Sequence, residues 1–247
     1  MSFAELAYPE VGALIAAERA TVLLLPLGAT EPHGPHAPLS TDTIISVAIC
    51  EQAAERLEDD PDVRALTLPP VAYGVTRYGA AFPGAISITE ATLRALVVEI
   101  CTSLAEQGFH RVVLVNNHFE PEQVQTLRQA VDVAGGCVRM LDLTRRQNAQ
   151  RLTDEFRSGS SHAGRYETSL VLAREPALVD RERMATLPAH TIDMPAAIAE
   201  GKTDFVAMEM DQAYCGAPAE ATSDEGEQTL ETLTQMLIEL VREVAAC

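Results

Sequence analysis

The chain has 247 residues, of which 18 are basic and 36 acidic, and its formal net charge is −18 at pH 7. Apolar residues make up 47% of the chain, and it contains no tryptophan. A chain of this length and apolar content is expected to bury a substantial core rather than to remain disordered. The absence of a basic surface argues against binding to nucleic acid or to an anionic membrane.

The cysteines and the N-terminal residues bear on the cellular compartment. An odd number of cysteines without a Cys-x-x-Cys pair predicts reduced thiols in a cytoplasmic protein rather than a disulfide framework. The N-terminal residues have no basic region followed by a long apolar run, so we expect no signal peptide. No apolar stretch approaches the roughly 20 residues that span a bilayer. The cysteines are Cys50, Cys101, Cys137, Cys215 and Cys247.

Short apolar runs alternate with segments of helical periodicity along the chain. This alternation predicts an α/β fold with a mainly parallel sheet and helices on both of its faces. We take residues 1–247 as a single domain, and we expect the irregular residues 176–222 to run over the surface, with a subunit contact as one use. Strands are predicted at 21–27, 65–68, 111–115 and 137–143, and helices at 41–58, 89–107, 121–134, 165–174 and 223–245. Thr89 and Ser223 are the predicted N-caps of their helices.

Carboxylates and imidazoles follow two of the predicted strands. Glu31 and His33 come after strand 21–27, and His118 and Glu120 come after strand 111–115. Residues two apart in an extended segment project to the same side, and parallel sheets form their sites at the carboxyl ends of the strands. With Asp42, whose two oxygens can bridge two ions, these residues are the right set for two divalent metals.

The alternative explanation is that each of these residues lies in a solvated loop. A single Glu-x-His is a weak motif and indicates little by itself. Two such pairs, both directly after buried strands, favour metal binding because buried charge is costly unless it is paired or bound to a metal.

A third polar stretch precedes the predicted helix at 165–174. It contains His162 and Glu167, which can face the same site if His162 lies in the loop before the helix. A purely structural explanation is that Ser160 or Ser161 caps the helix and Glu167 occupies its first turns. That explanation accounts for Glu167 but not for His162.

Four motifs resemble the creatininase (creatinine amidohydrolase) family. They are LPLGATEPHGPHAPLSTDT at 25–43, YG and FPG within 73–87, NNHFE at 116–120, and SHAGRYETS at 161–169. The resemblance implies a three-layer α/β/α sandwich, two metal ions and a homo-oligomer, with a hexamer as one form. Zinc is the expected metal, and manganese and iron also suit histidine and carboxylate ligands.

The resemblance also implies a role for each polar residue. Glu31 and His118 would bind one ion, His33 and Glu120 the other, and Asp42 would bridge them. His162 would be an acid/base group near the substrate, and Glu167 a second acid/base or orienting group.

The expected substrate pocket departs from that of creatininase itself. The creatininase pocket has tryptophan walls, whereas this chain lacks tryptophan and has Ser158 in the corresponding region. Thr76, Phe119 and Ser158 are the residues we expect around the substrate. The retained metal residues and the altered pocket predict a related enzyme with a different substrate.

The predicted function is a metal-dependent amidohydrolase that cleaves the C–N bond of a small amide, cyclic amide or formamide with a metal-activated water. One alternative is a deformylase or a peptidase-like maturation enzyme of the same family in cofactor biosynthesis. Another is a metal-binding protein that has lost catalysis. A dinucleotide-binding domain is disfavoured because no G-x-G-x-x-G follows the first strand.

Overall fold

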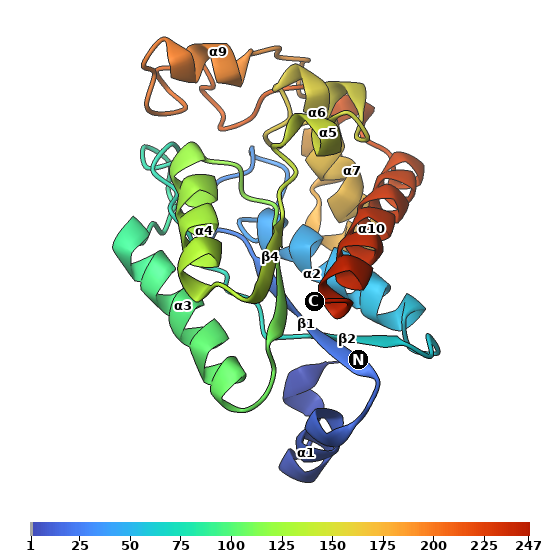
Figure 1. The fold of residues 1–247 in the computed structure, drawn as a ribbon. Helices are drawn as coiled ribbons and strands as arrows, with labels where there is room; N and C mark the ends of the chain where they lie inside the picture. Colours follow the sequence, from blue (N-terminus) through green and yellow to red (C-terminus); the bar gives the residue numbers. More distant parts are fainter. Residues whose placement is uncertain (1) are drawn as a thin grey trace.

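The computed structural model describes residues 2–247 (Figure 1). Within this range four strands form a parallel sheet in the order β2-β1-β3-β4. The central strands β1 and β3 are long apolar runs because both of their faces are buried, as is usual in parallel sheets. The strands are β1 (Ala20–Leu27), β2 (Val63–Thr67), β3 (Arg111–Asn116) and β4 (Cys137–Leu141).

Helices cover both faces of the sheet (Figure 1). Val22 and Leu24 pack into the core formed with α2, α7 and α10, whereas Leu23 and Leu25 pack into the core formed with α3 and α4. The alternation follows from the two-residue period of a strand. The predicted three-layer α/β/α sandwich is confirmed. The helices are α2 (Thr41–Arg56), α3 (Glu90–Glu106), α4 (Pro121–Ala134), α7 (Arg165–Arg174) and α10 (Ser223–Ala245).

Several shorter elements have no counterpart in the sequence-based expectation. Most are one or two turns long, too short to produce a clear apolar period. They are α1 (Tyr8–Ala16), α5 (Arg146–Ala149), α6 (Asp154–Ser158), α8 (Arg181–Met184), α9 (Met194–Ala199), and 3₁₀ turns at Phe3–Glu5, Pro176–Leu178 and Pro218–Glu220.

The two predicted helix caps have different outcomes. The Thr89 side chain accepts a hydrogen bond from the backbone N–H of Thr92, so Thr89 is the N-cap of α3 as predicted. The prediction for Ser223 is wrong by one residue. Thr222 caps α10 by accepting from the backbone N–H of Glu225, and Ser223 is the first helical residue.

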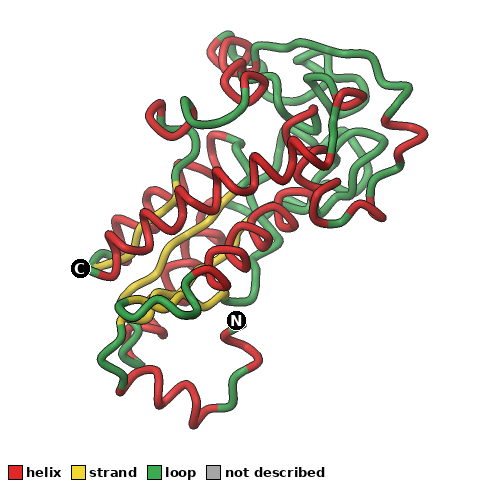
Figure 2. The backbone as a smooth tube through the Cα atoms, turned by 90° about the vertical axis from the view of Figure 1, so that its right-hand side faces the viewer, coloured by secondary structure: helices red, strands yellow, loops and turns green. Residues whose placement is uncertain are grey.

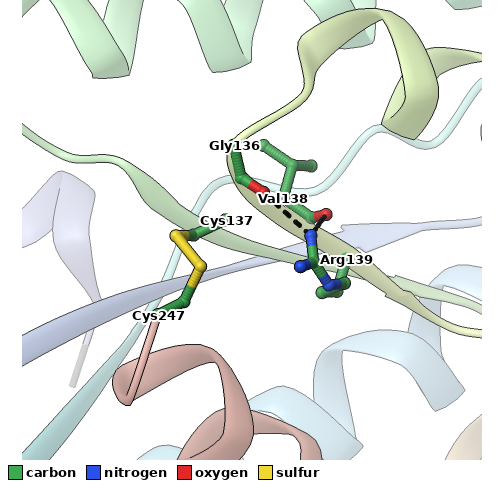
Figure 3. Close-up of a disulfide and its surroundings, with 5 residues drawn as sticks. All are labelled: Gly136, Cys137, Val138, Arg139 and Cys247. Carbon is green, nitrogen blue, oxygen red and sulfur yellow. Dashed lines mark hydrogen bonds between the residues drawn. A yellow bond between two sulfur atoms is a disulfide. The ribbon is translucent and has the colours of Figure 1, made fainter.

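The prediction that all the cysteines are reduced is also wrong, because Cys137 and Cys247 form a disulfide (Figure 3). They are 110 residues apart in sequence, but their Cα atoms lie 5.9 Å apart. Helix α10 packs along the sheet, and the chain end that follows it meets the start of the edge strand β4. Cys50, Cys101 and Cys215 are free and buried. The cysteine argument for a cytoplasmic location therefore no longer holds.

None of the helices within residues 2–247 combines the length and the apolar character needed to cross a membrane.

Candidate metal centre

The candidate site lies where the order of the strands reverses. From β1 the chain passes to β2 on one side, and from β3 it passes to β4 on the other. The loops after β1 and β3 therefore diverge and leave a crevice between the carboxyl ends of two adjacent strands, the usual position of a site in such a sheet. Figure 2 shows that the loops gather at one end of the molecule.

Each of the two central histidines is oriented by a backbone carbonyl. Nε2 of His118 lies 2.7 Å from the carbonyl oxygen of Val75, and Nδ1 of His33 lies 3.2 Å from that of Glu31. When these nitrogens carry the proton and donate it, the other nitrogen of each ring faces the carboxylates. Metal-binding histidines are commonly held in this way by a second partner.

Three carboxylates converge on these imidazole nitrogens. Asp42, in the first turn of α2, has Oδ1 3.0 Å from Nε2 of His33 and Oδ2 3.2 Å from Nδ1 of His118. Oε1 of Glu31 lies 3.0 Å from Nδ1 of His118, and Oε2 of Glu167 lies 3.4 Å from Nε2 of His33. Asp42 thus spans the two histidines, with Glu31 on the side of His118 and Glu167 on the side of His33.

The buried charges support each other electrostatically. Burial acts to lower the pKa of His33 and of His118, but the neighbouring carboxylates raise both pKa values well above the usual range. Burial acts to raise the pKa of Glu31 and of Asp42, and the histidines hold both below their usual values. A positive charge between these groups is therefore strongly favoured, whether it is a proton or a metal ion.

The residues fit a metal on two further counts. Nε2 of His33 is fully buried and makes no well-oriented hydrogen bond within the described structure, although oxygens of Asp42 and Glu167 lie within 3.4 Å, so a metal between them would give it a ligand bond. The nitrogen and oxygen atoms lie in buried groups of three within 4.8 Å of one another. These groups are Glu31, His118 and Glu120; His33, Asp42 and Glu167; and Glu31, His33 and His162.

Glu120 and Glu167 lie differently from the pairing that the family resemblance implies. Glu120 lies with Glu31 and His118 rather than with His33, and Glu167 lies next to His33. The Glu120 carboxylate accepts hydrogen bonds from the backbone N–H groups of Arg77 and Tyr78, at 2.8 and 3.1 Å to Oε2. Burial raises the pKa of Glu120 to about 7.

Glu167 and His162 both belong to the buried groups of candidate metal ligands. The Glu167 carboxylate accepts from the backbone N–H of Ala163 at 2.7 Å, which fixes it in the first turn of α7. Nδ1 of His162 lies 3.8 Å from Oε1 of Glu31, and its ring stacks 4.4 Å from the ring of Phe205. Burial and the nearby His33 lower the pKa of His162. The neutral imidazole is therefore favoured at this position.

Of the three residues expected around the substrate, Phe119 lines the cavity, whereas Thr76 and Ser158 do not. Thr76 is fully buried, and its hydroxyl donates to Oε2 of Glu31 at 2.5 Å. Ser158 turns away, because its hydroxyl donates to the backbone carbonyl of Glu155. Neither Thr76 nor Ser158 therefore lies where a substrate contact was expected. Thr76 positions Glu31, and Ser158 makes a hydrogen bond at the end of its helix.

A cavity of about 300 Å³ opens onto these candidate metal ligands. One wall is aromatic, with Phe119 and Phe156 in an edge-to-face pair 5.4 Å apart. Residues 190–216, which belong to the segment expected to run over the surface, fold over the site and form a further wall. Their contributions are Met194 and Pro195 at the start of α9, Ile198 and Phe205. Figure 1 shows α9 above α4, at the top of the molecule.

The cap formed by residues 190–216 escapes sequence analysis because it has little regular structure. Phe205, Met208 and Met210 are buried in a small apolar cluster with Tyr78. Apolar side chains within an otherwise acidic stretch are the only signal that could have indicated a buried role.

The fold and the buried cluster define an α/β protein with a candidate metal centre at the carboxyl edge of its sheet. A family profile described as "Creatinine amidohydrolase" matches residues 4–241. The chain therefore belongs to the creatininase family of amidohydrolases.

Individual relatives span most of the chain. It is 31% identical over 264 residues to creatinine amidohydrolase of Pseudomonas putida, covering 97% of this chain and 95% of that protein. It is 32% identical over 207 residues to mycofactocin precursor peptide peptidase of Mycolicibacterium smegmatis, covering 84% and 78%. A solved structure described as "Creatininase Mn" has a TM-score of 0.77 and 29% identity over 98% of both chains.

Proposed function

We propose that the protein is a hydrolase with two divalent metal ions that cleaves the C–N bond of a small amide. Asp42 would bridge the ions, with Glu31 and His118 on one and His33 and Glu167 on the other. The observation that carries the proposal is the pair of imidazoles, each anchored to a backbone carbonyl and facing carboxylates that share Asp42.

Two ions bound there would lower the pKa of a water molecule toward neutrality and polarise the scissile carbonyl. The side chains supply the proton transfers. Glu120 is held by two backbone N–H groups beside Glu31 and His118, and we propose it as the group that accepts and returns the proton. His162 lines the same cavity, and we propose it as the group that contacts the leaving nitrogen.

The cavity supports a small substrate. Its volume of about 300 Å³ is at the lower end of the range of roughly 300–1,000 Å³ for small-molecule sites. Its aromatic and aliphatic walls favour an apolar body next to the scissile amide. Zinc or manganese suits the nitrogen and oxygen ligands, and solved creatininases described as Mn and Zn–Zn forms are similar in fold.

A second candidate is a peptidase that matures a peptide precursor. It is favoured by the relatives named mycofactocin precursor peptide peptidase, at 32% identity in Mycolicibacterium smegmatis and 34% in Mycobacterium tuberculosis. The same metal chemistry would serve both candidates. Hydrolysis of short peptides but not of formamides or cyclic amides by the metal-loaded protein would select the peptidase.

Two matched variants test the assignment of the carboxylates. Glu120→Gln is expected to keep its metal and to lose hydrolysis by about 100-fold or more, since a general acid–base group contributes about 10²–10⁴-fold. Glu167→Gln is expected to lose metal. Elemental analysis and turnover of a panel of formamides, cyclic amides and short peptides measure both. Loss of metal from Glu120→Gln with full metal in Glu167→Gln would reverse the two roles.

A further inference from the structure

The rim of the cavity carries a fixed positive charge that the proposed chemistry does not use. Among the described residues that line the cavity, Arg157 is the one arginine or lysine, and the side chain is 42% exposed. The four carboxylates of the lining, by contrast, are all buried. Arg157 is therefore the cationic side chain that a ligand would meet if it extended from the buried groups toward this part of the rim. The four carboxylates are Glu31, Asp42, Glu120 and Glu167.

The balance of charge in the cavity favours an anionic ligand. On the proposed function, two divalent ions would offset the four buried carboxylates. The guanidinium of Arg157 is then the one permanently positive side chain of the lining, because an arginine stays protonated at every physiological pH. Asp154, which pairs with Arg157, lies outside the lining and is mostly exposed to water. Water screens an exposed pair of this kind, so the pair can be shared with a further anion.

Arg157 has donors to spare. A guanidinium carries five N–H groups. In Arg157, Nη1 donates to the backbone carbonyl of Leu152 at 2.5 Å and Nη2 donates to Asp154. The remaining N–H groups are free to form charge-assisted hydrogen bonds to a carboxylate.

The short helix that carries Arg157 is firmly attached to the site. Phe156 packs 5.4 Å from Phe119 and 4.9 Å from Tyr166, measured between ring centroids. The partly buried carboxylate of Glu155 accepts from the backbone N–H groups of Tyr166 at 2.6 Å and of Ala217 at 2.8 Å. A charged group on a rigid support can select a ligand by position.

We propose that Arg157 binds a free carboxylate of the substrate at the rim of the cavity. This inference rests on the proposed function and narrows its substrate to an amide that carries a carboxylate, with an apolar group between that carboxylate and the scissile bond. A short peptide with a free C-terminus has this chemistry. Phe119, Phe156 and Phe205 are the surfaces against which the apolar group packs.

Binding of a matched pair of compounds tests the proposal without the need for turnover. The probes are N-acetyl-L-phenylalanylglycine and its C-terminal carboxamide, which differ in charge at one end only. Calorimetry on the zinc-loaded protein is expected to show that the acid binds at least about tenfold tighter, the effect of one charge-assisted hydrogen bond. Arg157→Gln removes this preference and leaves the affinity for the carboxamide and the metal content unchanged, whereas Arg157→Lys retains part of it.

Arg145→Gln is the matched control, because Arg145 is an exposed arginine that lines a different groove. It is expected to leave both affinities unchanged. A preference for the acid that persists in Arg157→Gln would assign the carboxylate to the metals and overturn the proposal. Equal binding of the two probes to the wild type, or binding of neither, would also overturn it. A preference that depends on Arg157 in a protein that hydrolyses no amide would retain this proposal and refute the proposed function.

Discussion

Each central imidazole is oriented by a backbone carbonyl at one nitrogen and faces carboxylates with the other, and this pairing is the smallest unit of the site. The sequence indicates His33 and His118 because each lies two residues from a glutamate after an apolar run. It gives no indication of the carbonyl of Val75, which orients His118, and it assigns Thr76 to the substrate, whereas the hydroxyl of Thr76 donates to Glu31. Those partners come from the irregular segment between β2 and α3, which has no periodic signal. Sequence reasoning therefore finds the candidate ligands but not the groups that orient them.

Asp42→Ala tests the bridging assignment. Because the two oxygens of Asp42 face different histidines, the variant is expected to lose more than one metal equivalent per chain. Elemental analysis after dialysis measures this loss, and Asp59→Ala, at an exposed aspartate, is the control that keeps its metal. Retention of full metal by Asp42→Ala would show that Asp42 does not bridge.

Thr76→Val tests the positioning of Glu31. The substitution keeps the shape of the side chain but removes the hydroxyl that donates to Oε2 of Glu31. Loss of such an outer partner typically weakens metal binding by about 10- to 100-fold. Competition with a zinc chelator gives the affinity, and an unchanged value would mean that Thr76 does not orient Glu31.

At the scale of elements, the alternating strands and helices follow from the sequence, but the linkage of α10 to β4 does not. The amphipathic stripe of residues 223–245 predicts the helix. The odd number of cysteines gives no indication of the disulfide that links the chain end after this helix to β4. Packing of α10 along the sheet places Cys247 next to Cys137 in the folded chain (Figure 3). A contact between residues 110 apart in sequence leaves no local signal.

The disulfide is expected to stabilise the fold by restricting the unfolded chain. For the long loop that it closes, removal typically costs about 2–4 kcal/mol of unfolding free energy. Denaturant unfolding of the wild type with and without a reductant measures this cost. The double variant Cys137→Ser, Cys247→Ser should match the reduced wild type and should not respond to the reductant. If reductant left wild-type stability unchanged, the disulfide would contribute nothing.

The turn after β4 gives a prediction about pH. Burial acts to raise the pKa of Asp142, but Thr144 and Arg128 donate to its carboxylate and hold the pKa below the ordinary value of 3.8. The unfolded chain therefore takes up this proton at a higher pH than the folded chain, and the stabilisation, present above about pH 5, declines as the pH falls through and below 3.8.

Asp142→Asn is expected to be less stable than the wild type at neutral pH, with a difference that narrows as the solution is acidified. Urea unfolding at a series of pH values from 7 to 3 measures the two free energies. A difference that stays constant over this range would show that the charge on Asp142 does not contribute.

For the whole molecule, the sheet and its two layers of helices are predictable because buried parallel strands are apolar runs that alternate with helices. The cap formed by residues 190–216 is not, because its side chains are buried by contacts with distant loops rather than by a regular period. Phe205, for example, packs against Tyr78 and His162. The single domain, the homo-oligomer and the cytoplasmic location stay predictions.

The number of zinc ions that the protein binds tests the central claim most directly. The wild type, stripped with a chelator and titrated with zinc in a calorimeter, is expected to bind two ions per chain, because Asp42 joins two groups of buried ligands. Binding of two equivalents supports the paired centre. Saturation at one equivalent, or no binding at the buried cluster, would contradict it.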